Sequence, residues 1–125
     1  MSFVQASDVG AVSNSGNAAA SLSGVVAGHG LICYVWTDSA TAITGFSDSG
    51  SATWSGIPTT TPNLQKDTNN NEWLYIFTAT NVAAGTHTIT VTGPNAWSIL
   101  IEDTNANYRT AVGQAPLVAA ITACT

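Results

Sequence analysis

Charge is the first thing that this sequence has little of. Its 125 residues include 2 lysines or arginines and 7 aspartates or glutamates, whereas charged residues make up about a quarter of an ordinary soluble domain. The two basic residues, Lys66 and Arg109, are too few to neutralise a phosphate backbone. We therefore expect no nucleic-acid partner, and the same shortage disfavours an anionic membrane surface as a partner.

Long apolar runs and an export signal are also missing. No stretch approaches the roughly 20 apolar residues of a membrane span, so we expect no membrane insertion. Residues 1–5 have neither the basic region nor the long apolar region of a secretory signal. Two explanations fit: a signal was removed and replaced by a start methionine, or the protein is made in the cytosol and reaches the exterior by another route, as virion proteins do.

Cysteine is scarce and widely spaced. Cys33 and Cys124 lie too far apart in the sequence for the close cysteine and histidine pairs of a zinc motif. One interpretation is a structural disulfide that ties the last residues to a central strand. The other is two free thiols, one of them buried, and the spacing alone does not decide between the two.

The sequence does contain short apolar alternations separated by small polar turns, which predict strands. Residues 31–36 are apolar on both faces, which favours a central place in a sheet. Residues 86–92 alternate most regularly, with four threonines on one face and His87, Ile89 and Val91 on the other. Further strands are expected near residue 4 and residue 54 and within 18–26, 42–46, 72–78, 97–101 and 115–122, with a long polar loop over 55–71.

These patterns predict an all-β fold: a single antiparallel two-sheet β-sandwich of about eight short strands, jelly-roll or immunoglobulin-like. We expect one domain over residues 1–125. Residues 104–125 form a C-terminal extension within it, either a last strand or a docking segment. The hydrophobic fraction of 45% argues against disorder.

Five segments carry a resemblance to a known group of proteins. They are residues 3–5, the strand over 31–36 with Gly28 before it, the segment ITGFSDSG at 43–50, residues 52–54 and the segment ATNVAAGTHTITV at 79–91. Together they resemble the small β-sandwich domains of bacterial exported proteins and phage virion (decoration or surface) proteins. The resemblance covers roughly residues 3–103, implies no catalytic set, and ends where Glu102, Asp103, Thr104 and Asn105 replace the family's usual ending.

No catalytic set can be assembled from these residues, so we expect that the protein is not an enzyme. A hydrolase needs a nucleophile, a base and an orienting group, or two carboxylates across a substrate. His29 lies between two glycines and is predicted to be an exposed loop residue, whereas His87 is predicted at the inward end of a strand. The acidic pair Glu102 and Asp103 is predicted at a strand end that faces water.

The loop before residue 72 offers oxygen ligands. Asp67, Asn69 and Asn71 are weak calcium candidates, but the segment lacks the glycine of an EF-hand loop, and an Asn-rich turn in water explains it more simply. We expect no cofactor and no structural metal. As contacts for a ligand such as a sugar, we single out Trp54, Asn69 and Asn70, with Trp54 as a loop anchor as the alternative.

The remaining tryptophans, Trp36, Trp73 and Trp97, are predicted to lie in the core. The apolar segment over residues 115–122 is predicted to form a strand. If this strand were unpaired, its free edge would tend to pair with another chain. We single out Leu117, Val118 and Ile121 as assembly residues, which pair either within the chain's own sheet or with a neighbouring subunit.

The expected role is a non-enzymatic structural protein of a virion surface or an extracellular assembly, most plausibly a phage capsid or tail decoration or cement protein. Its expected partners are other structural proteins, including copies of itself. The alternatives are a carbohydrate-binding module or lectin, with glycans as partners, and the subunit of a secreted bacterial filament.

Overall fold

The structure is a computed structural model, and it describes residues 3–9, 17–39, 41–55, 65–67, 72–93 and 95–104. These residues are strands, turns and irregular segments. Within these ranges no helix is long and apolar enough to cross a membrane. The strands, in chain order, are β1 Phe3–Val9, β2 Asn17–Val25, β3 Gly30–Asp38, β4 Gly45–Asp48, β5 Trp54–Ser55, β6 Gln65–Asp67, β7 Glu72–Ala79, β8 Gly85–Thr92 and β9 Ala96–Asp103.

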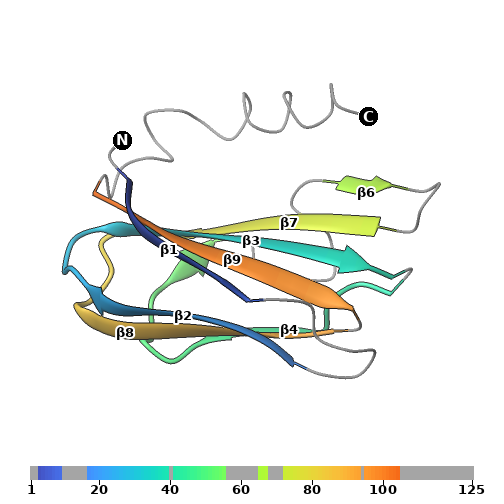
Figure 1. Cartoon of the computed structure of the whole chain (residues 1–125), viewed down its shortest axis with the longest axis horizontal. Coiled ribbons are helices and arrows are strands. Elements are labelled where there is room, and N and C mark those ends of the chain that lie inside the picture. Colours follow the sequence, from blue (N-terminus) through green and yellow to red (C-terminus); the bar gives the residue numbers. More distant parts are fainter. Residues whose placement is uncertain are drawn as a thin grey trace.

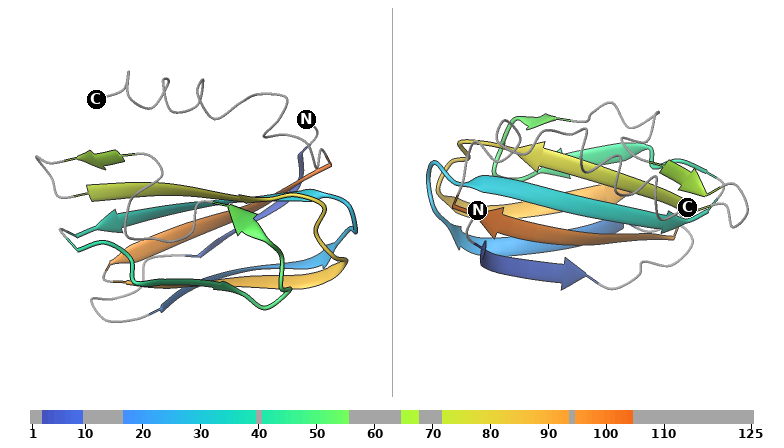
Figure 2. Two further views of the ribbon diagram at one scale, coloured as in Figure 1. Left: turned by 180° about the vertical axis from the view of Figure 1, so that it is seen from behind. Right: turned by 90° about the horizontal axis from the view of Figure 1, so that it is seen from above.

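The predicted antiparallel β-sandwich is confirmed (Figure 1). One sheet has the strand order β1-β9-β3-β7-β5, with β6 also paired to β7, and the other has the order β2-β8-β4. Figure 2 shows the two sheets as separate layers. Among the described strands, the first, β1, pairs with the last, β9, and β2 pairs with β8 and β3 with β7. This nested pairing is that of a jelly roll, whereas the immunoglobulin fold places consecutive strands side by side.

Two strand predictions need correction. The segment predicted as a continuous loop over 55–71 contains β6, which pairs with β7 through Gln65↔Leu74 and Asp67↔Glu72. The strand predicted over 42–46 is β4 at Gly45–Asp48, which begins three residues later. The last strand predicted over 115–122 lies outside the described residues. The central position predicted for residues 31–36 is confirmed, because β3 lies between β9 and β7.

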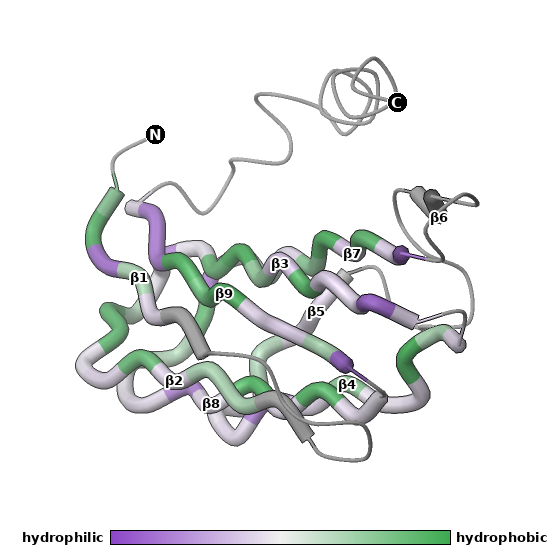
Figure 3. Tube along the Cα trace, turned by 45° about the vertical axis from the view of Figure 1, so that its right-hand side comes forward, coloured by the Kyte–Doolittle hydropathy of each residue, from purple (hydrophilic) through white to green (hydrophobic). Residues whose placement is uncertain are grey.

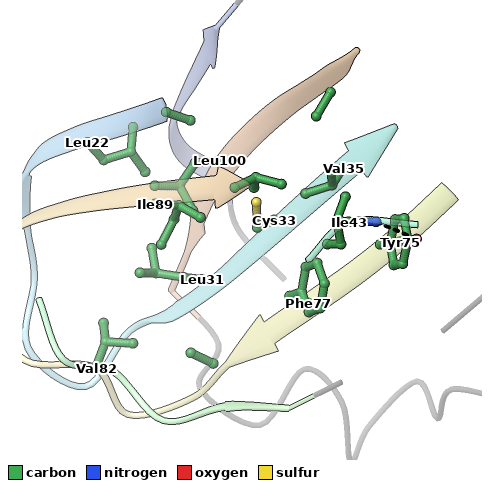
Figure 4. Packing of buried hydrophobic residues seen from close by; sticks show 14 of the residues in the cluster. Leu22, Leu31, Cys33, Val35, Ile43, Tyr75, Phe77, Val82, Ile89 and Leu100 are labelled. Carbon is green, nitrogen blue, oxygen red and sulfur yellow. Dashed lines mark hydrogen bonds between the residues drawn. The ribbon is translucent and has the colours of Figure 1, made fainter. Parts of the chain in front are cut away.

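The core fills the space between the two sheets. The inward row of β8 is buried at His87, Ile89 and Val91, and its four threonines face outward, both as predicted. Ile43 enters the core between β3 and β4 and donates its backbone N–H to the hydroxyl of Tyr75 at 3.2 Å. Figure 4 shows the packing of the labelled core residues, which are Leu22, Leu31, Cys33, Val35, Ile43, Tyr75, Phe77, Val82, Ile89 and Leu100.

Two hydroxyl groups in this core have no hydrogen-bond partner among the described residues. They are those of Thr37 on β3 and Ser98 on β9, both of which are buried. A buried polar group without a partner costs about 1–3 kcal/mol. Thr37→Val keeps the branched shape and removes the hydroxyl, so we expect a gain of about 1 kcal/mol in the free energy of unfolding.

Urea denaturation of Thr37→Val beside the outward control Thr90→Val measures this gain. The control should change stability by less than about 0.5 kcal/mol. A clear loss of stability in Thr37→Val would show that the hydroxyl has a partner after all.

Candidate functional site

Both histidines and two buried carboxylates gather at one end of the sandwich. The turn between β2 and β3 meets the turn between β7 and β8 there: Gly28 N–H donates to the carbonyl of Val82 at 2.9 Å, and Val82 N–H donates to the carbonyl of His29 at 3.0 Å. Each histidine pairs with one carboxylate, His87 with Asp48 and His29 with Glu102. The sequence pattern did not predict either pair.

Asp48, the last residue of β4, organises the turn that leads to β5. Its Oδ1 accepts the backbone N–H of Gly50 at 2.8 Å, and its Oδ2 accepts the N–H of Ala52 at 3.1 Å and the indole Nε1–H of Trp54 at 3.0 Å. Its Oδ2 also lies 2.9 Å from His87 Nδ1. Burial alone would raise the pKa of Asp48, but these hydrogen bonds outweigh it and hold the pKa below its usual value.

His87 confirms the prediction of an inward histidine. Its side chain is 1% exposed. Nδ1 faces Asp48, and Nε2 lies 3.0 Å from the carbonyl oxygen of Ala83. Burial disfavours the charged ring, but the bonds to Ala83 and Asp48 outweigh it, so the pKa of His87 lies above its usual value. Both ring nitrogens are engaged, so the ring is not free to act as a general base.

Glu102 overturns the prediction of an acidic pair that faces water. Its side chain is fully buried, and Asp103 beside it is also buried. Glu102 Oε1 accepts the backbone N–H of Val26 at 2.9 Å, and its Oε2 accepts Gln5 Nε2–H at 2.6 Å. Burial would raise its pKa, but the bonds from Val26, Gln5 and His29 keep the pKa below its usual value.

His29 is likewise not the exposed loop residue that was predicted. Its Nδ1 lies 2.7 Å from Glu102 Oε1, and its side chain is largely buried. The turn at Gly28, with φ of 86°, brings His29 back over the end of β9. Glu102 thus ties β1 and the turn between β2 and β3 to the end of β9.

Within both clusters the carboxylates bond to donors of the protein itself. Each carboxylate is used as an acceptor by backbone and side-chain donors, and no hydroxyl or thiol of the described residues is bonded to either histidine. Among the described residues, no three histidine, cysteine, aspartate or glutamate side chains come together as metal ligands. Asp67 lies in β6, and Asn69, Asn70 and Asn71 lie outside the described residues, so the calcium and ligand-contact hypotheses stay predictions for them.

Trp54 is held by the protein in the way that the loop-anchor alternative requires. Its indole N–H donates to Asp48, and its ring packs edge-on against Phe46 with centroids 5.3 Å apart. The ring is partly buried against the core. As a ligand contact it would offer only part of its surface.

The core prediction is wrong for Trp36 and Trp97. Both lie on the outer face of the six-stranded sheet, where they are cross-strand neighbours with ring centroids 4.3 Å apart. Trp36 is 37% exposed, and Ile99, further along β9, is 44% exposed. Trp73 comes closer to the prediction, since it is partly buried and stacks on Tyr75. Figure 3 shows hydrophobic residues along β3, β7 and β9.

Cys33 lies in the core. It is fully buried between the sheets, and burial raises the pKa of its thiol to about 12. A neutral, enclosed thiol is unreactive. Cys124, and the assembly residues Leu117, Val118 and Ile121, lie outside the described residues, so the disulfide and the pairing of the tail stay predictions.

No protein-family model, no curated protein and no solved structure matches this chain.

Proposed function

We propose that this protein is a non-enzymatic structural component of an exterior assembly, of the kind that decorates or cements a phage capsid or tail, and that copies of it associate through one sheet. The observation that carries the proposal is the outer aromatic face, which we define as Trp36 on β3, Leu74 on β7, and Trp97, Ile99 and Ile101 on β9. The low charge of the chain and its resemblance to virion and exported β-sandwiches support the same role.

The outer aromatic face is continuous across three strands. Trp36 lies opposite Trp97 on one side and Leu74 on the other, and Ile99 and Ile101 continue the outward row of β9. None of these residues carries a charge. Apolar patches on soluble proteins mark interaction surfaces, because burying them gains about 25 cal/mol per Å².

A second copy of the chain is the occupant that fits this face best. The five defining residues bring no like charges together when the face meets itself across a two-fold axis. The acidic residue in register with one of them, Asp8 opposite Ile99, lies on the edge strand β1. The charge nearest to Trp36 along β3 is Asp38, an exposed residue at the strand end, where interfaces are usually polar. Two such sheets pack face to face about 10 Å apart, as in a sandwich.

Sedimentation velocity over a range of protein concentrations tests the association. Ile99→Ser removes about 1 kcal/mol of apolar burial from each copy, so we expect the dimer to weaken roughly thirtyfold. Val26→Ser is the matched control, because Val26 is 49% exposed but lies in the turn after β2. A monomer at every concentration, or equal effects of the two variants, would contradict the proposal.

The carbohydrate-binding alternative has one observation in its favour, namely the partly exposed tryptophan pair on the outer aromatic face. Against it, the two rings pack against each other at an interplanar angle of 32° and so cover part of the surface that a sugar would use. Binding to a glycan array that is lost in Trp36→Ala, with sedimentation unchanged, would replace self-association by sugar binding as the role of this face.

A further inference from the structure

We propose that the end of the sandwich that carries the histidines is a proton-operated latch: the charged ring of His87 locks the turn after β4 to the turn before β8, and the loss of one proton opens this corner. The proposal is independent of self-association.

The geometry requires a doubly protonated ring. The carbonyl oxygen of Ala83 can only accept, so His87 Nε2, 3.0 Å away, must carry a proton. Nδ1 lies 2.9 Å from Asp48 Oδ2, and an ionised carboxylate can also only accept. With both partners acceptors, both ring nitrogens donate, and the ring is an imidazolium.

Asp48 is ionised because of what surrounds it. Besides the histidine, it accepts the N–H groups of Gly50 and Ala52 and the indole N–H of Trp54. A protonated carboxyl group would turn one oxygen into a donor that faces other donors. The negative charge therefore stays on Asp48, and the proton stays on the ring of His87.

The other titratable groups near this pair come from the packed strands. Glu102 on β9 adds a second negative charge that favours the imidazolium. Cys33 on β3 lies within the field of Asp48, and burial keeps its thiol neutral. The described residues of β2, which also pairs with β8, include no titratable side chain. Among the described residues, the other histidine at this end, His29, is bonded to Glu102.

The ring supports the turn mechanically as well as electrostatically. A Cβ added at Gly50 would overlap the ring of His87, so the turn lies directly on the imidazolium. Ser49 N–H donates to the carbonyl of Thr88, and Thr88 N–H donates to Ser49 Oγ, each at 3.0 Å. When the ring loses the Nδ1 proton, a lone pair faces the carboxylate at the centre of this turn, and the contact becomes repulsive.

The direction of the pH dependence follows from the pKa shifts of His87 and Asp48. The pKa of His87 is raised above 6.5, so its stabilising effect is complete below about pH 6.5 and is lost as the pH rises through the folded-state pKa. The pKa of Asp48 is lowered below 3.8, so its effect is present above about pH 3.8 and is lost as the pH falls through its folded-state pKa. The latch is closed in mildly acidic solution and opens on the alkaline side.

Amide hydrogen exchange and ring nitrogen NMR on the full chain test the latch. We expect two protonated ring nitrogens on His87 at pH 6. The second set of ring signals in the same spectrum belongs to His29, the other histidine of the chain. The exchange rates, corrected for the intrinsic rate, give the equilibrium constant for local opening at the amides of Gly50 and Ala52. We expect this opening constant to rise by up to about tenfold per pH unit above pH 6.5.

The variant His87→Gln should abolish this dependence and leave the opening constant flat between pH 6 and 9. If the variant fails to fold, the two measurements on the unmodified chain decide the matter alone. A neutral His87 ring at pH 6, or pH-independent opening at Gly50 and Ala52 in the unmodified chain, would overturn the proposal.

Discussion

Replacing Asp48 by alanine is expected to lower the free energy of unfolding by about 3–5 kcal/mol at pH 6. Asp48 is 2% exposed and accepts hydrogen bonds from two backbone amides, one indole and one imidazolium. Its removal leaves a positive ring buried without a counter-charge, together with three unpaired N–H groups. Truncating one partner of a buried pair costs more than the pair contributes, because the other charge stays in the protein interior.

Urea denaturation of this variant beside Asp38→Ala measures the effect. Asp38 is an exposed residue at the end of β3 that bonds to Asn95 through its backbone: its N–H donates to the carbonyl of Asn95 at 3.1 Å, and its carbonyl accepts from Asn95 Nδ2 at 3.0 Å. Its substitution should stay within about 0.5 kcal/mol. Equal, small losses in both variants would contradict the account of the Asp48 cluster.

The second large effect is expected for Glu102→Ala, with a loss of about 3 kcal/mol in the free energy of unfolding. Glu102 is fully buried and is the common acceptor for Gln5, Val26 and His29. Without it, three buried or half-buried donors lose their partner. Glu72→Ala, at the start of β7, is the control and should change stability by less than about 1 kcal/mol.

The Glu102→Ala variant should destabilise one region of the protein before the others. Gln5 links β1 to Glu102 through its side chain, and β1 pairs only with β9 among the described strands. We therefore expect amide exchange to accelerate first in β1 and at Val26. Uniform acceleration across both sheets would show that Glu102 has no special role in holding β1.

The alternation of apolar residues predicted most of the strands but assigned β9 to the wrong face. Trp97, Ile99 and Ile101 form the more apolar row, and Trp97 is predicted to lie in the core, yet this row faces outward. The inward row of β9 contains Ser98, Leu100 and Glu102, which is the more polar of the two. Because the side chains alternate with a period of two, one wrong choice inverts every residue of the strand.

The same inversion explains the error at Glu102, which lies in the inward row of β9. The error at Trp36 has a different cause. β3 is apolar on both faces, so its pattern predicted a central strand but could not say that one apolar face stays partly exposed. β8 was predicted correctly because its two rows differ sharply, with threonines on one side and His87, Ile89 and Val91 on the other.

The histidine–carboxylate pairs join residues that are far apart in the sequence. His87 and Asp48 are 39 positions apart, and His29 and Glu102 are 73 apart. No local spacing encodes such pairs, since the nested strand order brings the turns together at one end. The sequence feature closest to either pair is the short run Asp48-Ser49-Gly50. It predicts a turn, but it does not predict that the ring of His87 is buried against that turn.

The claim that the outer aromatic face joins two copies is tested most directly by isotope-filtered NMR on a mixture of labelled and unlabelled protein. We predict intermolecular contacts from the methyl groups of Ile99 and Ile101 in one copy to the rings of Trp36 and Trp97 in the other. Absence of these contacts at concentrations where the protein associates, or contacts that map to the threonine face of β8, would contradict the claim.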